Sequence, residues 1–213
     1  MRCDKKDLLL YGVTDRSWLG DRTLAQQVEA SLRGGATMIQ LREKHMDRGS
    51  ILAQALELRE LCGRYGVPLI LNDDAELAQA AGSDGVHVGQ SDMEAGRVRA
   101  LLGEDKLIGV SARTVEQALA AQAAGADYLG VGAMFPTGTK QDTRPVSYDT
   151  LKAICAAVDI PVVAIGGIGA GNVAELAGSG IAGVAVVSAL YAQPDVEAAT
   201  RSLRAQVERV VGP

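Results

Sequence analysis

Two aspartates in the middle of the chain are the residues best suited to hold a metal ion. Asp73 and Asp92 each follow a short apolar run, Pro68 to Leu71 and Gly85 to Val88. If these runs are neighbouring strands about 5 Å apart, both carboxylates can share one hard cation. Mg²⁺ is the natural candidate, because one or two carboxylates commonly hold it while phosphate oxygens and water complete its octahedron. The alternative is that each aspartate caps the helix that follows it.

Basic side chains are expected near these aspartates. Arg42 and Lys44 follow another apolar run, Met38 to Leu41, and Lys140 belongs to a long irregular stretch. Together they would supply positive charge to a diphosphate that the metal ion also binds. The pattern therefore predicts a Mg²⁺-dependent site for a phosphate ester. The residues predicted to act in catalysis are Arg42, Lys44, Ser111 and Lys140.

A glycine-rich segment, AIGGIGAGN from Ala164 to Asn172, superficially resembles a dinucleotide fingerprint. It follows the seventh apolar run instead of the first, and the chain after it is too short for a Rossmann unit with its acidic ribose ligand. After strands seven and eight of a barrel, such glycines can expose N–H groups that cradle a phosphate monoester. The alternative is a plain turn.

Short apolar runs alternate with longer amphipathic stretches along the whole chain. The helix predicted from Ser50 to Tyr65 has apolar residues every three or four positions, and Asp195 is predicted to cap the last helix. Strands that alternate with helices imply parallel strands and right-handed crossovers, and eight such units close into a barrel. The strands are predicted at Leu8 to Val13, Met38 to Leu41, Pro68 to Leu71, Gly85 to Val88, Leu107 to Val110, Tyr128 to Val131, Val162 to Ile165 and Val184 to Val187.

The fold class is therefore predicted to be α/β, a single (β/α)8 TIM barrel in which residues 1–213 form one domain. An open doubly wound sheet is the alternative. Active sites of such barrels lie at the C-terminal ends of the strands, and the long stretch from Gly132 to Pro145 is expected to lie over the site. His87 falls within a short predicted strand, and we expect it to be structural.

Composition excludes several classes of protein. Hydrophobic residues make up 47% of the chain but aromatic residues only 3%, as is typical of parallel-sheet proteins with aliphatic cores. A net charge of -5 excludes the electrostatic footprint of a nucleic-acid binder. No apolar run approaches the roughly 18 residues of a membrane helix, and the three cysteines lack disulfide or metal spacing. We expect a cytoplasmic protein, while exposed barrel helices do not specify an oligomeric state.

These motifs, in this order, resemble the thiamine phosphate synthase family, also called thiamine phosphate pyrophosphorylase. The resemblance runs nearly from end to end of the chain. Its segments are YGVTD (11–15), GATMIQLREK (35–44), LILNDD (69–74), DGVHVGQSD (84–92), IGVS (108–111), GADYLGVG (125–132), FPTGTK (135–140), IGGI (165–168) and VAVVSAL (184–190).

The resemblance implies a (β/α)8 barrel that couples hydroxymethylpyrimidine diphosphate to a thiazole ethyl phosphate and releases diphosphate. It assigns Mg²⁺ to Asp73 and Asp92. The residues that it assigns to the pyrimidine diphosphate are Gln40, Leu41, Arg42, Glu43, Lys44, Asn72, Ser111 and Lys140. Those that it assigns to the thiazole phosphate are Thr137, Gly138, Thr139, Gly167, Val187 and Ser188.

Two other functions are considered. The related thiazole phosphate tautomerases share the fold and the phosphate site but transfer a proton, which requires an acid or base over the ring. A histidine would be expected in the loop after the sixth strand, where this chain has Ala133. The other possibility is a noncatalytic sensor of phosphorylated thiazoles, which would have little need of both carboxylates and the cations. One departure from the family, Ala112 and Arg113 after Ser111, concerns the shape of the pyrimidine pocket.

Overall fold

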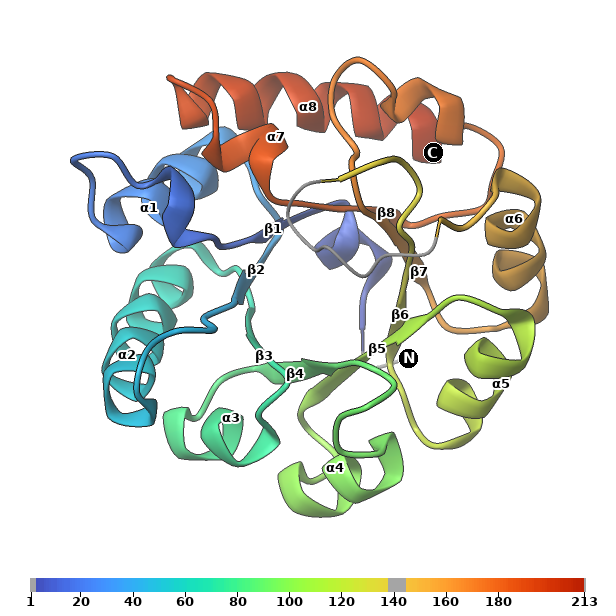
Figure 1. The fold of residues 1–213 in the computed structure, drawn as a ribbon, viewed down its shortest axis with the longest axis horizontal. Helices are drawn as coiled ribbons and strands as arrows, with labels where there is room; N and C mark the ends of the chain where they lie inside the picture. The colour runs from blue at the N-terminus through green and yellow to red at the C-terminus, as the bar shows by residue number, and fades with distance from the viewer. Residues whose placement is uncertain (1–2, 138–144, 213) are drawn as a thin grey trace.

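Eight parallel strands close into a barrel in a computed structural model that describes residues 3–137 and 145–212 (Figure 1). Each strand pairs with the next in sequence, and β1 pairs with β8 to close the ring, with Leu10 opposite Val184. The strands are β1 (Leu10–Val13), β2 (Met38–Leu41), β3 (Leu69–Asn72), β4 (Gly85–Val88), β5 (Leu107–Ala112), β6 (Tyr128–Val131), β7 (Val162–Ile165) and β8 (Gly183–Val186). The predicted (β/α)8 barrel is confirmed.

Helices surround the barrel on its outside, as Figure 1 shows. The β7–β8 crossover has a short 3-10 helix among its described elements, η3 (Val173–Leu176). The α-helices are α1 (Leu24–Gly34), α2 (Arg48–Tyr65), α3 (Ala75–Ala81), α4 (Ala95–Leu102), α5 (Val115–Ala123), α6 (Tyr148–Ala157), α7 (Ser188–Tyr191) and α8 (Val196–Val211). Asp195 caps α8, as predicted, by accepting a hydrogen bond from the N–H of Ala198. Among the described residues, no helix is both long and apolar enough to span a bilayer.

The apolar residues divide into two clusters, because successive strand residues face opposite sides of the barrel wall. The larger cluster lies between the strands and the helices and includes Ile39 and Leu41 of β2. The smaller fills the barrel interior and includes Tyr11, Met38 and Tyr128. Aliphatic side chains dominate the outer layer, which agrees with the low aromatic content.

A short 3-10 helix, η1 (Lys5–Leu8), lies at the centre of the ring in Figure 1, where the start of the chain is coloured blue. Leu8 and Cys3 are fully buried within the interior cluster. The predicted first strand therefore begins too early: Leu8 belongs to η1, and β1 starts at Leu10. Both positions are buried in the barrel, so hydrophobicity alone could not separate them.

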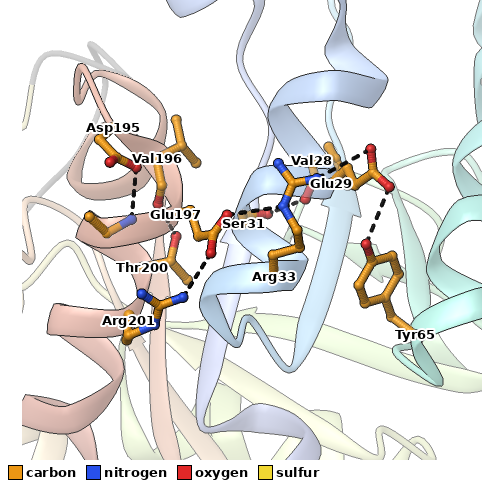
Figure 2. Close-up of polar contacts among 11 residues, drawn as sticks. Val28, Glu29, Ser31, Arg33, Tyr65, Asp195, Val196, Glu197, Thr200 and Arg201 are labelled. Carbon is orange, nitrogen blue, oxygen red and sulfur yellow. Dashed lines mark hydrogen bonds and ion pairs between the residues drawn. The ribbon is translucent and has the colours of Figure 1, made fainter.

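The first and last long helices pack closely and complete the outer layer. A Cβ at Gly34 would lie 2.5 Å from the Cβ of Thr200 and 2.6 Å from the carbonyl oxygen of Glu197, so α1 and α8 meet backbone to backbone there. Figure 2 shows the ion pairs around this contact. Arg33 of α1 lies 3.0 Å from Glu197, which Arg201 also pairs at 2.7 Å. These pairs are exposed, so we expect the close packing to contribute more to stability than the charges.

Candidate active site

The two predicted metal-binding aspartates follow neighbouring strands, and their carboxyl groups lie close enough for Asp92 to raise the pKa of Asp73. Asp73 comes directly after β3, and its N–H donates to the carbonyl of His87 in β4 at 2.8 Å. Asp92 lies in the turn after β4, where its Oδ2 accepts from the N–H of Gly89 at 2.7 Å. The backbone thus fixes each side chain near the other.

Neither aspartate caps the helix that follows it. The N-cap of α3 is Asp74, whose Oδ1 accepts from the N–H of Leu77 at 2.7 Å. The N-cap of α4 is Glu94, whose side chain accepts from the N–H of Gly96. The capping alternative for Asp73 and Asp92 is therefore wrong. Because other residues cap α3 and α4, both carboxylates are available to bind a cation.

The pKa of Asp73 is raised above the ordinary aspartate value. The largest cause is partial burial of its carboxyl group, although the residue as a whole is exposed; the charge of Asp92 and a hydrogen bond to Asp92 follow. A hydrogen bond from Asn72 and the positive charge of Lys44 act in the opposite direction. Asp73 also has a φ of 65°, in the left-handed region that aspartate tolerates better than most residues. The site therefore concentrates negative charge that a cation would neutralise.

These donors fit Mg²⁺ better than a softer metal. Within the described part of the chain, no group of three or more His, Cys, Asp and Glu side chains could hold a metal ion. Two neighbouring carboxylates match the usual Mg²⁺ site, in which phosphate oxygens and water supply the other ligands, whereas structural zinc sites need four nitrogen or sulfur ligands. Asp73 and Asp92 are the residues that could hold Mg²⁺.

The end of β2 brings a second group of predicted residues to the same end of the barrel. Arg42 is largely buried; its N–H donates to the Thr14 hydroxyl at 3.0 Å, and its guanidinium lies 4.0 Å from Asp15. Glu43 pairs with Arg16 at 2.7 Å. Burial raises the pKa of Glu43 despite that partner. Lys44 is exposed and near Asp73, so its charge is available to an anion there.

Leu41 differs from its neighbours in direction. Its side chain belongs to the outer cluster between strands and helices, so toward the barrel interior it can offer only backbone groups. Gln40, one residue earlier, faces inward and donates from Nε2 to the Tyr11 hydroxyl at 2.6 Å. The alternation of strand residues explains the difference.

Ser111, at the end of β5, is held by two contacts. Its Oγ lies 3.0 Å from Nε2 of His87, and its carbonyl accepts from Nε2 of Gln90 at 2.7 Å. The ring of His87 also reaches the hydroxyl of Tyr128, 3.2 Å from Nδ1. The expectation that His87 is structural missed its contact with a predicted site residue. The available signal was its strand position, two residues before the loop that carries Asp92.

Glycines line the opposite side of this end of the barrel, after β7. Gly167 has a φ of 66°, and a Cβ there would lie 2.5 Å from the carbonyl oxygen of Pro136 and 2.8 Å from that of Phe135. Only glycine allows this close approach of the β6–α6 connection. Asn172 holds the turn by donating to the Gly167 carbonyl at 2.9 Å.

The helix α7 begins directly after β8, the strand that follows β7 in sequence. Its N-cap is Val187, which has no polar side chain to satisfy the first N–H groups of the helix, and Ser188 is exposed. Thr137 is partly buried on the approach from β6. The predicted residues Gly138, Thr139 and Lys140 lie outside the described residues. The remaining candidates thus form an acidic side after β3 and β4 and a glycine side after β7 and β8.

Comparisons with known proteins identify the family. A family model described as thiamine monophosphate synthase matches residues 10–190. A thiamine-phosphate synthase of Ruminiclostridium cellulolyticum is 48% identical over 199 residues, which cover 93% of this chain and 95% of that protein. One from Chloroflexus aurantiacus is 50% identical over 202 residues, covering 94% and 93% respectively. The solved thiamine phosphate pyrophosphorylase of Pyrococcus furiosus has a TM-score of 0.90 at 38% identity, covering 98% of this chain and 99% of that one. The chain belongs to the thiamine monophosphate synthase family.

Proposed function

We propose that residues 1–213 act as one catalytic domain, a transferase that makes thiamine phosphate. It would join 4-amino-2-methyl-5-hydroxymethylpyrimidine diphosphate to 4-methyl-5-(2-phosphoethyl)thiazole and release diphosphate. Relatives named thiamine-phosphate synthase, 44% to 50% identical over nearly the whole chain, support the reaction. The observation that carries the proposal is the interaction between Asp73 and Asp92 beside Lys44, which follows β2.

Asp73 and Asp92 would hold Mg²⁺, which supplies positive charge to the diphosphate oxygens. The raised pKa of Asp73 supports this assignment, because a cation would relieve the repulsion between the two carboxylates. Without the ion, Asp73 would retain a proton more readily than an isolated aspartate does.

Charge development determines what the protein must do in the reaction. When the C–O bond to diphosphate breaks, negative charge grows on the leaving group, and the aminopyrimidine ring stabilises the cationic methylene carbon. Arg42, Lys44 and Lys140 would bind the departing diphosphate. Each charge-assisted hydrogen bond is worth about 1.5–3 kcal/mol, or roughly ten to a hundredfold in rate if it is felt mainly in the transition state.

The thiazole phosphate would bind on the glycine side. Backbone N–H groups near Gly167 and after β8 are suited to a phosphate monoester, because N–H groups that no side chain caps can donate to an anion. The residues assigned to it are Thr137, Gly138, Thr139, Gly167, Val187 and Ser188. The thiazole nitrogen would then attack the methylene carbon from this side.

This addition requires no general base, since a neutral ring nitrogen supplies the electron pair. The related tautomerases need an acid or base over the thiazole ring, and Ala133, which is buried after β6, cannot provide one. The relatives described above are synthases. We expect the reaction to take place in the cytoplasm, where the three cysteines would stay reduced.

A direct assay tests the proposal. Both substrates are mixed with the protein, with Mg²⁺ or with excess EDTA, and thiamine phosphate and free diphosphate are measured. We expect equal amounts of both products, formed only with Mg²⁺, and diphosphate release at least roughly tenfold slower in Lys140→Ala. Product formation that is indifferent to EDTA would contradict the metal assignment, and no product under any condition would contradict the function.

A further inference from the structure

Polar side chains form one continuous chain of hydrogen bonds through the barrel interior, from the end of β2 to the end of β5. It runs from Gln40 through Tyr11, Tyr128 and His87 to Ser111, with distances of 2.6, 3.0, 3.2 and 3.0 Å. Both ends are residues that the family resemblance assigns to the pyrimidine diphosphate. The three residues in the middle have no role in that function so far.

The strands leave room for this chain at two glycines. A Cβ at Gly109 of β5 would overlap the rings of Tyr128 and His87. A Cβ at Gly130 of β6 would lie 3.0 Å from Cε1 of His87. Burial raises the pKa of Tyr128 well above that of a free tyrosine, and that of Tyr11 as well. Both hydroxyls therefore keep their protons and can donate.

The amide of Gln40 sets the direction of donation. Its Nε2 donates to the Tyr11 oxygen, and an amide nitrogen cannot accept in return. Tyr11 is 1% exposed, so its own proton needs a partner, and the Tyr128 oxygen is the acceptor at 3.0 Å. Tyr128 is fully buried, and its O–H in turn donates a hydrogen bond to Nδ1 of His87.

The hydrogen bond from His87 to Ser111 runs in the same direction. A neutral imidazole has one N–H, so a ring whose Nδ1 accepts from Tyr128 has its proton on Nε2. Nε2 then donates to Ser111 Oγ. The Ser111 hydroxyl keeps its own proton to donate to a bound molecule, while the amide of Gln40 keeps its carbonyl oxygen to accept. If the Gln40 amide were turned by 180°, every hydrogen bond in the series would run in the opposite direction. Gln40 would then offer a donor to the bound molecule, and Ser111 would offer an acceptor.

We propose that Tyr11, Tyr128 and His87 are positioning residues that link these two groups, so that the site selects a 4-amino over a 4-oxo pyrimidine. An aminopyrimidine has an exocyclic amine that donates and ring nitrogens that accept, which match Gln40 and Ser111. The 4-oxo ring has a carbonyl and an N–H at the same edge. Its carbonyl oxygen would face the Gln40 carbonyl oxygen, and the Ser111 hydroxyl would lose the ring nitrogen that accepts its proton. This inference rests on the proposed function and on the family resemblance, which assigns both Gln40 and Ser111 to the pyrimidine diphosphate.

The test compares the two pyrimidine rings in variants that interrupt this series of hydrogen bonds. For Tyr128→Phe, Tyr11→Phe and the double variant, the measured quantities are kcat/KM for the amino substrate and the inhibition constant of its 4-oxo diphosphate analogue. We expect kcat/KM to fall about tenfold or more, because a mismatched polar group in the site is poorly tolerated, while the inhibition constant stays the same or decreases. The double variant should lose no more than the worse single variant, since either change interrupts the same chain.

Tyr191→Phe is the matched control. Tyr191 is also fully buried, but its hydroxyl lies in the outer layer, 3.3 Å from Ser31 Oγ. We expect both measured constants to stay within about twofold of wild type, since loss of a neutral bond this long has a small effect. The inference is overturned if Tyr128→Phe weakens both rings equally or neither, or if the two single losses multiply in the double variant. Wild-type protein that makes no thiamine phosphate would instead overturn the proposed function.

The position of the His87 proton gives an independent measurement on the wild-type protein. The chain has two histidines, so the ¹⁵N signals of His87 are identified by comparison with His87→Gln. We expect a protonated Nε2 and an unprotonated Nδ1. A proton on Nδ1, or on both nitrogens, would overturn the assigned direction even if a tyrosine variant failed to fold.

Discussion

Adjacent aspartates of this chain have different tasks, and their backbone partners show which is which. The carboxylate of Asp74 caps the first turn of α3, while Asp73, one residue earlier, interacts with Asp92. The sequence predicted the pair Asp73 and Asp92 from their places after neighbouring strands. It could not assign the caps, because Asp73 and Asp74 are chemically identical and one residue apart.

The repulsion between the two carboxylates predicts that a substitution at Asp73 has opposite effects on the stability of the metal-free protein and on metal binding. Without metal, Asp73→Asn should raise the melting temperature at pH 7 by at most about 3 °C, because in a partly solvated site the repulsion that it removes is worth no more than about 1 kcal/mol. The raised pKa means that this cost appears as pH rises above the ordinary aspartate value of 3.8, so the difference should vanish at lower pH. Thermal unfolding at several pH values measures it.

The same variant should lose the rise in melting temperature that Mg²⁺ gives the wild-type protein, and most of its activity. Asp159→Asn is the control, since Asp159 is exposed and precedes β7, at the end of the barrel opposite the site. A Mg²⁺-dependent rise that persists in Asp73→Asn would show that the ion binds elsewhere.

The hydrogen-bonded tyrosines were the part of the site that residue types could not reveal. Tyr11 and Tyr128 fit equally well as apolar filling of a barrel, and they lie 117 positions apart in the chain. Only the closure of the barrel brings their hydroxyl groups within 3.0 Å, so the contact is a property of the fold and not of a local motif.

At the scale of elements, periodicity predicted most strands to within one or two residues, since parallel strands buried on both faces appear as apolar runs. It failed where burial has another cause. The run that includes Leu8 belongs partly to η1, which fills the barrel interior, and η3 is too short to show a helical period. Apolar character marks a residue as buried, but it does not identify the element that buries it.

The contact between α1 and α8 predicts that close packing there contributes more to stability than the neighbouring ion pairs do. Gly34→Ala should destabilise the protein by about 1–3 kcal/mol, because the new Cβ meets the backbone of α8 and the helices must separate. Arg33→Ala, one residue earlier, removes exposed ion pairs and should cost no more than about 1 kcal/mol.

Urea unfolding of both variants measures the two losses. Their specific activities at 25 °C should equal that of the wild-type protein, since the contact lies on the outside of the barrel. A larger loss in Arg33→Ala than in Gly34→Ala would reverse the assigned importance of packing and charge.

At the scale of the whole molecule, burial controls the chemistry of the cysteines. It raises the pKa of the Cys3 and Cys62 thiols to about 12 and that of the half-buried Cys155 to about 11. Relative to the ordinary value of 9.0, the Cys155 thiolate is about a hundredfold scarcer at pH 8. Labelling by Ellman's reagent should therefore be slow in the native protein and begin at Cys155, whereas all three thiols should react at once in denaturant. Rapid labelling of Cys3 in the native state would show that η1 leaves the barrel interior.

The pairing of β1 with β8 has a consequence for how the protein is made. A ribosome delivers residues 10–13 early, yet their partners in β8 emerge more than 170 residues later, with Leu10 opposite Val184. Until then, the nascent chain exposes an unpaired strand edge and an unfilled interior, both of which attract other chains. We expect the last two strands to emerge before any proteolysis-resistant barrel forms, so that messages truncated before β8 should yield ribosome-bound chains that depend on chaperones.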